Sequence, residues 1–217
     1  LATTASLRPF FRPRSVAVIG ASPDPQSIGH RLLHGLLTNR FQGSVYAVNP
    51  HTTELAGRPV FPSIRVVPGP VDLAVIAVPR DIVPSVIEEC AACGVCAVIV
   101  ITAGFAETGP AGAALQTKLL DQVRGHGMRM IGPNCFGVLN TDPDVRLNAT
   151  FTSLFPMHGR VALSSQSGAI GIATLAGVRR IHVGLSSFVS VGNKADVSTN
   201  DLLQYWESSH SYHLFLR

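Results

Sequence analysis

Charged residues, aromatic residues and long apolar runs are all scarce in this sequence of 217 residues, with 14% charged and 6% aromatic. The longest apolar run, residues 94–103, has the length of a strand and falls well short of the roughly 18 residues that span a bilayer. We therefore expect no membrane partner. Residues 1–7 lack a basic segment followed by an apolar core, so we expect no secretory signal and a cytoplasmic protein.

Long basic runs are also missing, although the net charge is +4. A nucleic-acid surface usually gathers Lys and Arg on one face, with aromatic side chains where single strands are bound. Neither pattern is present, so we expect no nucleic-acid partner. A small polyanionic ligand accounts for the mild positive charge.

The four cysteines are Cys90, Cys93, Cys96 and Cys135. The first three have a C-x-x-C-x-x-C spacing, which could hold zinc or an iron–sulfur cluster. However, residues 82–92 have helical periodicity that stops at Gly94, and no fourth cysteine followed by proline completes a ferredoxin pattern. We therefore expect reduced, structural cysteines and no metal, with a metal or cluster site as the alternative.

Short runs rich in Val, Ile and Ala alternate with helical patterns over the first 140 residues. The predicted strands are 15–20, 44–48, 71–78, 97–102 and 128–131, and the predicted helices are 29–40, 81–92 and 110–126, with a short one near 53–55. Continuous apolar runs favour strands that are buried on both faces, and strands separated by helices favour right-handed crossovers. The sequence predicts an α/β fold with a Rossmann-like, doubly wound parallel sheet over residues 7–139.

The remaining residues predict a linker and part of a second domain. Residues 140–158 are rich in Asn, Thr, Asp and Pro and poor in periodicity, which indicates a linker. Strands at 161–164 and 184–191 and helices at 168–178 and 198–206 then begin a second α/β unit. Two strands are too few for a stable open sheet, so residues 159–217 are predicted to form an incomplete domain.

Ligands of open α/β sheets bind where the carboxyl ends of the strands meet helix N-termini. The predicted strand exits are 20–22, 49–50, 78–80, 102–105 and 132–135, and we expect them to form one continuous rim. The first exit, residues 20–22, leads into the predicted helix and indicates a phosphate cradle, because small residues admit an anion to the helix N-terminus. For any single exit, ordinary loop punctuation is the alternative.

Two common nucleotide motifs are missing from these exits. A nicotinamide dinucleotide site needs G-x-G-x-x-G after the first strand and an acidic residue at the end of the second. Here the second strand ends in Asn49-Pro50-His51, and the glycine spacing does not match. No Walker A motif is present either.

Several ordered motifs do match a known family. They occupy residues 10–22, 46–50, 72–79 and 103–107, and they continue at 132–137, 164–168 and 190–196. Together they resemble the CoA-binding domain and the following flavodoxin-like domain of NDP-forming acyl-CoA synthetases, which are relatives of succinyl-CoA synthetase. The resemblance covers almost the whole chain.

The resemblance implies coenzyme A as the cofactor, bound across the rim as CoA or acyl-CoA. The implied contacts are Gly20, Ala21, Ser22, Ser27 and Gly29 for the diphosphate, Asn49 and Pro50 for the adenosine end, Val78, Pro79, Ala103, Gly104, Phe105 and Glu107 for the pantetheine arm, and Asn134 near the thiol. The helix that starts at Ser165, Gln166, Ser167 and Gly168 would direct its N-terminus at a phosphate. An ordinary helix cap is the alternative for that last group.

The implied reaction converts acyl-CoA, ADP and phosphate into free acid, CoA and ATP through an acyl-phosphate and a phosphohistidine. The family's Ser-His-Thr-Gly motif does not occur in these 217 residues, and Ser209-His210-Ser211 lacks the glycine. No ATP-grasp region is recognisable, so we expect that region from another chain or from a longer sequence. We assign no catalytic residue and expect the chain to be inactive alone. The alternatives are a non-catalytic CoA-binding regulatory module, for example of a protein acetyltransferase, and an NAD-binding oxidoreductase domain.

Overall fold

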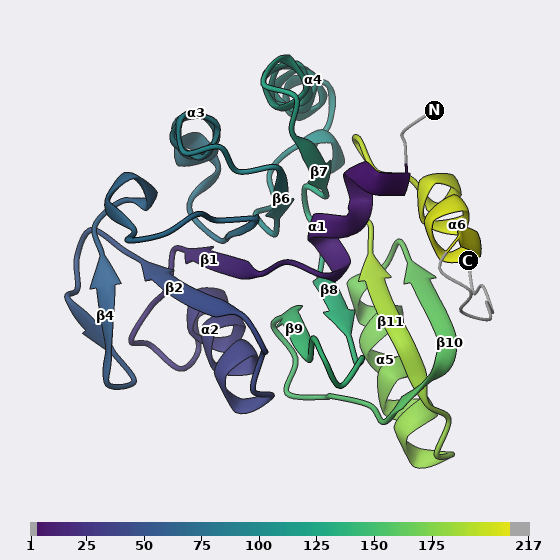
Figure 1. Cartoon of the computed structure of the whole chain (residues 1–217). Helices are drawn as coiled ribbons and strands as arrows, with labels where there is room; N and C mark the ends of the chain where they lie inside the picture. The colour runs from purple at the N-terminus through teal and green to yellow at the C-terminus, as the bar shows by residue number, and fades with distance from the viewer. Residues whose placement is uncertain (1–3, 209–217) are drawn as a thin grey trace.

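The structure, a computed structural model, describes residues 4–208. It is an α/β protein with two sheets that lie side by side (Figure 1). The first sheet has seven strands in the order β3-β4-β2-β1-β5-β6-β7. These strands are β1 (Ser15–Ile19), β2 (Ser44–Val48), β3 (Glu54–Leu55), β4 (Arg58–Phe61), β5 (Leu73–Ile76), β6 (Ala97–Val100) and β7 (Arg129–Ile131).

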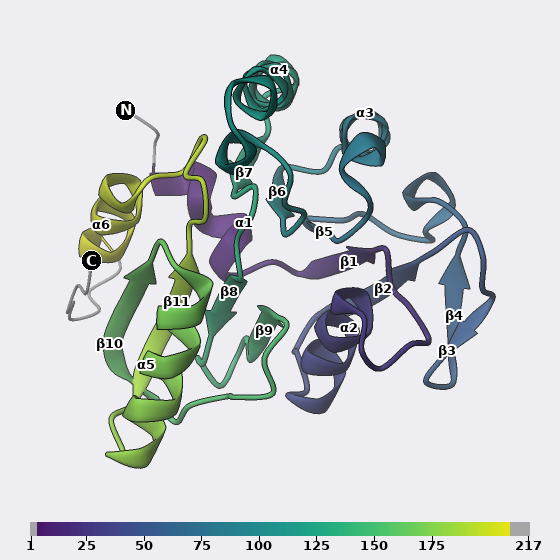
Figure 2. The ribbon, with the colours of Figure 1, turned by 180° about the vertical axis from the view of Figure 1, so that it is seen from behind.

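Helices cover both faces of the first sheet. Helix α2 (Ile28–Thr38) lies on one face, and α3 (Val83–Ala92) and α4 (Pro110–Gly125) lie on the other (Figure 2). The shorter helical segments are η1 (Thr4–Leu7), α1 (Arg8–Phe11), η2 (Ile64–Val66), η3 (Arg80–Ile82) and η4 (Ala106–Thr108). Every residue of β1, β5 and β6 is buried, as the continuous apolar runs predicted.

The pairing confirms the predicted doubly wound parallel sheet. Strand β1 pairs in parallel with β2 and β5, and the parallel series continues through β6 to β7. The carboxyl ends of these five strands therefore lie along one edge, and the predicted rim is an edge of the real sheet.

The short helix predicted near residues 53–55 is wrong. Residues 54–61 form the hairpin of β3 and β4, an antiparallel pair that extends the sheet beside β2. Its turn residues Ala56 and Gly57 have φ values of 51° and 70°. Two successive positive φ values suit a tight two-residue hairpin turn and interrupt a right-handed helix.

The second sheet has four strands in the order β10-β11-β8-β9, which differs from the expected two. The strands are β8 (Gly137–Asn140), β9 (Leu147–Thr150), β10 (His158–Ser165) and β11 (Leu185–Ser190). Strand β8 pairs antiparallel with β11 and with β9. The segment expected to be an irregular linker therefore contains β9 and the start of β10. The sheet gains the two strands that the sequence interpretation missed.

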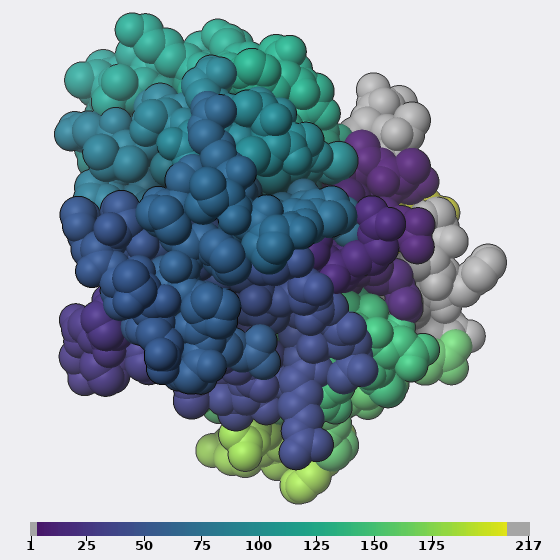
Figure 3. Space-filling model, turned by 60° about the vertical axis from the view of Figure 1, so that its left-hand side comes forward, coloured from purple at the N-terminus to yellow at the C-terminus, as the bar shows by residue number. Residues whose placement is uncertain are grey.

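Two helices complete the second unit, α5 (Gly168–Arg180) and α6 (Thr199–Ser208). Phe136, Leu163, Leu175 and Phe188 form a buried cluster between this sheet and α5. The opposite face of the sheet shares a larger apolar core with α2, α1 and α6 of the molecule. In the space-filling view the green residues of the second unit lie directly against the purple and blue residues of the first (Figure 3).

No helix within residues 4–208 is long and apolar enough to cross a membrane.

Candidate functional site

The exit of β1 is a tight turn in which the backbone approaches its neighbours closely. The N–H groups of Gly20 and Ala21 both donate to the carbonyl oxygen of Val48, at 3.0 and 3.3 Å. Gly20 has a φ of 94°, and a Cβ atom there would lie 2.3 Å from the carbonyl oxygen of Ala77. Only glycine fits this position, because both the φ value and the contact exclude a side chain.

Helix α2 begins directly behind this turn. Ser27 is its N-cap, and its hydroxyl accepts a hydrogen bond from the N–H of His30 at 3.1 Å. A Cβ atom on Gly29 would lie 1.8 Å from the carbonyl oxygen of Gly20, so the helix N-terminus contacts the turn without a side chain between them. A helix N-terminus presents N–H groups and the positive end of the helix dipole, which is the arrangement that binds phosphate.

The next exit is fastened to the first by a side chain. The Asn49 amide donates to the carbonyl oxygen of Ala21 at 2.6 Å, and its Oδ1 accepts from the N–H of His51 at 2.7 Å. Asn49 therefore fixes the turn after β1 from the end of β2. Pro50 beside it is exposed.

Two hydrogen bonds join the exits of β5, β6 and β7. The Thr102 hydroxyl donates to the carbonyl oxygen of Val78 at 2.7 Å, and the N–H of Asn134 donates to the carbonyl oxygen of Thr102 at 2.9 Å. Asn49 joins the exits of β1 and β2, and Gly20 lies close to Ala77 and Val78 at the exit of β5. All five predicted exits therefore adjoin one another. The structure thus brings the predicted rim together as one continuous edge.

The predicted CoA contacts fall into three groups by exposure. Six of them are half-buried, namely Gly20, Ser22, Ser27, Asn49, Val78 and Gly104. Ala21, Gly29 and Phe105 are buried, and Phe105 packs in the core that includes Leu119 of α4. Only the main chain of these three residues can face a ligand. Residues at the surface, where a ligand could touch the side chain, are Pro50, Pro79, Ala103, Glu107 and Asn134.

Glu107 lies at the centre of a polar network rather than standing free. Its Oε1 accepts from the N–H groups of Gly104 and Phe105, at 2.5 and 3.2 Å, and its Oε2 accepts from the Asn193 side-chain amide at 2.5 Å. Burial raises the pKa of Glu107, but the hydrogen bonds from Asn193 and Gly104 outweigh it, and the net pKa is lowered. The carboxylate is therefore ionised and accepts hydrogen bonds only.

The predicted anion-binding helix of the second unit adjoins the same end of the rim. Ser167 is the N-cap of α5, and Ser165 Oγ donates to the carbonyl oxygen of Ser167 at 2.8 Å. Gln166 is exposed. A Cβ atom on Gly168 would lie 3.3 Å from Cβ of Phe136. Phe136 is the residue that directly follows the β7 exit at 132–135.

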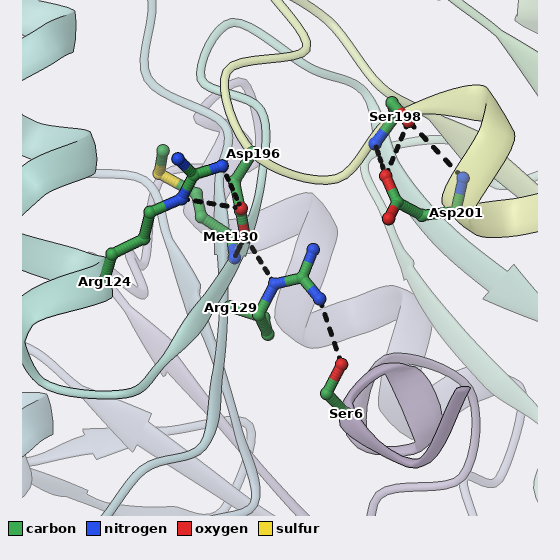
Figure 4. Close-up of polar contacts among 7 residues, drawn as sticks. All are labelled: Ser6, Arg124, Arg129, Met130, Asp196, Ser198 and Asp201. Atoms are coloured by element: carbon green, nitrogen blue, oxygen red, sulfur yellow. Dashed lines mark hydrogen bonds and ion pairs between the residues drawn. The ribbon is translucent and has the colours of Figure 1, made fainter. Parts of the chain in front are cut away.

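A buried carboxylate joins the second unit to the edge of the first sheet. The Asp196 side chain is 2% exposed and accepts from Arg129, Arg124 and the N–H of Met130 in β7 (Figure 4). Burial raises the pKa of Asp196, but hydrogen bonds from Arg129, Met130 and Arg124 outweigh it, and the net pKa lies below 3.8. The loop after β11 is therefore held against β7.

Sequence reasoning missed four residues that shape this site: His30, Arg80, Thr102 and Asn193. His30 Nδ1 lies 3.2 Å from the carbonyl oxygen of Ser22, and Arg80 lies within 3.4 Å of the carbonyl oxygen of Gly104. Arg80 and Thr102 could have been found, because both lie within the predicted exits 78–80 and 102–105. Asn193 could not, since its partner Glu107 is 86 residues away in the chain.

The cysteines do not gather into a metal site within the described part of the chain. Residues 4–208 contain no group of three or more His, Cys, Asp or Glu that could hold an ion. All four cysteines are free thiols, and Cys90 and Cys135 are buried. Burial raises the pKa of each of these two thiols to about 12.

A Rossmann-type sheet with a glycine-lined helix N-terminus at its carboxyl edge defines a domain that binds a nucleotide-like ligand. Residues 14–141 match the family described as "CoA binding domain", and the chain belongs to this family. Residues 158–216 match a second family, described as "Succinyl-CoA ligase like flavodoxin domain". The matches confirm the resemblance and support coenzyme A as the ligand.

Relatives of this chain are ADP-forming acid–CoA ligases. The chain is 43% identical over 206 residues to acetate–CoA ligase [ADP-forming] I of Archaeoglobus fulgidus, covering 95% of this chain and 30% of that protein. It is also 43% identical over 210 residues to the alpha subunit of acetate–CoA ligase [ADP-forming] I of Pyrococcus furiosus, covering 95% of this chain and 45% of that subunit. The chain thus spans less than half the length of these relatives.

A solved structure has the same fold. It is the dinucleotide-forming acetyl-coenzyme A synthetase 1 of Ca. Korarchaeum cryptofilum in complex with phosphate and ADP. The TM-score is 0.91 at 44% identity, and the match covers 96% of this chain and 44% of that one.

Proposed function

We propose that this chain is the CoA-binding portion of an ADP-forming acyl-CoA synthetase and that it binds CoA or acyl-CoA along the rim. The observation that carries the proposal is the approach of Gly29 to Gly20, where a Cβ atom would lie 1.8 Å from a carbonyl oxygen. This leaves a cradle of main chain at a helix N-terminus, which fits a diphosphate.

The ligand is proposed to run along the rim in the order of the connected exits. The diphosphate lies against residues 20–22 and 27–29, and the adenosine end lies by Asn49 and Pro50. The pantetheine arm passes the exits of β5 and β6, and the thiol lies near Asn134. The hydrogen bonds from Asn49 to Ala21 and from Thr102 to Val78 support this path, because they hold the successive exits side by side.

The proposed reaction of the complete enzyme is acyl-CoA plus ADP plus phosphate giving free acid, CoA and ATP. Within it, the N-terminus of α5 is proposed to stabilise a phosphate, with Ser165, Gln166, Ser167 and Gly168 around it. An ATP-grasp domain or subunit would bind the nucleotide, and the names of the relatives are consistent with ADP as that nucleotide. The chain alone is proposed to bind CoA without ligating it, in the cytoplasm.

The proposed division keeps a CoA-binding domain over residues 7–139 and a flavodoxin-like domain over 159–217, joined by 140–158. The pairing of β8 and β9 with β11 means that the second sheet draws strands from both sides of residue 140. Cleavage within the loop between β9 and β10 would test whether the first domain folds by itself.

The experiment that tests the function is a thermal-shift titration followed by a ligase assay. CoA should raise the melting temperature by mass action, whereas NAD should not. A shift with NAD and none with CoA contradicts the proposal. The ligase assay adds the ATP-grasp subunit of a relative together with acyl-CoA, ADP and phosphate. Formation of ATP that depends on acyl-CoA and on this chain supports the ligase assignment, whereas a regulatory module should leave the mixture inactive.

A further inference from the structure

The order of donors and acceptors in the polar network around Glu107 is set by Glu107 itself. Its carboxylate accepts hydrogen bonds and cannot donate them. Its Oε2 lies 2.5 Å from the side-chain nitrogen of Asn193. Asn193 must therefore present its NH₂ group to Glu107, because two oxygens facing each other would repel.

The orientation of Asn193 is confirmed by a second acceptor. The same NH₂ group donates to Oε1 of Gln116 at 2.8 Å, which occupies its second hydrogen. The Oδ1 atom of Asn193 then points the other way and accepts from Nδ2 of Asn134 at 3.3 Å. Asn134 therefore directs its side-chain NH₂ group toward Asn193.

Asn134 is the last residue of this network, and its side-chain oxygen is available to accept a hydrogen bond. Asn134 is exposed, and within residues 4–208 no protein hydrogen bond uses its Oδ1. An amide can turn either way in the absence of neighbours, so its orientation depends on the network. Here the network determines that an oxygen, not an NH₂ group, faces outward at the exit of β7.

We propose that Glu107 and Asn193 are positioning residues that make Asn134 a hydrogen-bond acceptor for the ligand. This inference rests on the proposed function, since it concerns the thiol end of the same CoA site. The ligand group that it selects is a donor, either an amide N–H of the pantetheine arm or the thiol S–H. In this role Glu107 acts through Asn193, whose side-chain NH₂ group it holds with Oε2.

A swap of the two positioning residues separates this role from ordinary packing. Glu107→Gln keeps the oxygen that accepts from Gly104 and Phe105 but offers an NH₂ group to Asn193, which then turns and reverses Asn134. Asn193→Asp places two carboxylates face to face. The double variant Glu107→Gln/Asn193→Asp restores a donor–acceptor pair, and the carboxylate that it introduces at position 193 again requires Asn134 to donate inward.

The measurement is CoA affinity by isothermal titration calorimetry at neutral pH, with the 217-residue chain. Glu107→Gln should weaken CoA binding about tenfold, as expected for a mispaired polar contact, and the double variant should bind within about twofold of the wild type. Asn193→Asp alone still accepts from Asn134, so it is measured as the parent of the double variant. Asp121→Asn and Asn200→Asp make the same kinds of charge change at exposed positions and should leave the affinity unchanged.

Asn134→Ala provides a second test. Its melting temperature is measured beside the affinity, because Asn134 has a φ of 55°, which is unfavourable for alanine. It should weaken CoA binding, and adding Glu107→Gln in that background should change the affinity less than about twofold. Desulfo-CoA, which lacks the thiol, identifies the donor: a persistent Glu107→Gln effect assigns an amide, and a lost effect assigns the thiol.

Three results would overturn the inference. They are a Glu107→Gln variant that binds CoA like the wild type, a double variant that binds CoA no better than Glu107→Gln, and a full Glu107→Gln effect in the Asn134→Ala background. Failure of the wild type to bind CoA is a different result, because it contradicts the proposed function itself.

Discussion

The carboxylate of Asp196 accepts a hydrogen bond from the main-chain N–H of Met130 at 3.0 Å, across 66 residues of sequence (Figure 4). Met130 lies in β7, the edge strand of the first sheet. Two further hydrogen bonds lie along the same edge. The N–H of Ala195 donates to the carbonyl oxygen of Gly132, and the N–H of Val197 donates to the carbonyl oxygen of Met130. The loop after β11 therefore covers an otherwise open sheet edge and joins the two units.

Asp196→Ala should destabilise the protein by about 3 kcal/mol, because it leaves Arg129 and the N–H of Met130 without their buried partner. The measurement is the free energy of unfolding in urea. Asp121→Asn, at an exposed position of α4, is the matched control and should change stability by less than about 0.5 kcal/mol. An Asp196→Ala variant as stable as this control would show that the carboxylate does not hold the units together.

Acid should remove the contribution of Asp196. Its pKa in the folded state is lowered from 3.8, so the stabilisation is complete above that value and is lost as the pH falls through the folded pKa. The stability difference between the wild type and Asp196→Asn should therefore shrink as the pH falls below 3.8. A difference that stays constant from neutral pH down to about pH 2 would contradict this assignment.

Gly20→Val should abolish CoA binding, because a Cβ atom at this position would lie 2.3 Å from the carbonyl oxygen of Ala77 and displace the turn. Calorimetric titration with CoA measures the effect. Gly125→Ala is the control, since nothing lies within 4 Å of its added Cβ atom. A folded Gly20→Val variant with wild-type affinity would remove the diphosphate from this turn.

Asn49→Ala should weaken CoA binding and lower stability by about 1 kcal/mol, because the carbonyl oxygen of Ala21 loses its donor and the turn loosens. The matched control is Asn200→Ala, which removes an exposed amide from α6. Equal CoA affinity for both variants would mean that Asn49 does not shape the site.

Thiol labelling should distinguish the cysteines by burial. Cys96 is exposed and should react first with a thiol reagent, whereas Cys90 and Cys135 should react only on unfolding, since the pKa of each is raised to about 12. Mass spectrometry after brief labelling of the native protein identifies the sites. Rapid modification of Cys135 would show that the β7 exit opens in solution.

The first sheet could be predicted from the sequence because its central strands are continuous apolar runs, which the structure buries completely in β1, β5 and β6. Strands β8 and β9 could not be predicted, since they carry polar residues that look like a loop. In the fold these residues are buried and paired. Asn140 donates to the carbonyl oxygen of Phe11 at 2.8 Å, and the Thr150 hydroxyl donates to Asn148 at 2.6 Å.

The rim was predictable for a similar reason, because parallel strands end at one edge wherever they occur. The connections between its turns were not. Thr102 contacts Val78 across 24 residues, and Asn193 contacts Glu107 across 86, and neither pair has a local sequence signal. Nothing in the sequence therefore indicated that the Glu107 carboxylate accepts from Gly104, Phe105 and Asn193.

The most direct test of the central claim is a crystal structure of this chain grown with CoA. We predict that the diphosphate lies at the turn of residues 20–22, against the N–H groups at the N-terminus of α2. A structure with that cradle free of ligand and the CoA molecule bound elsewhere on the chain would contradict it.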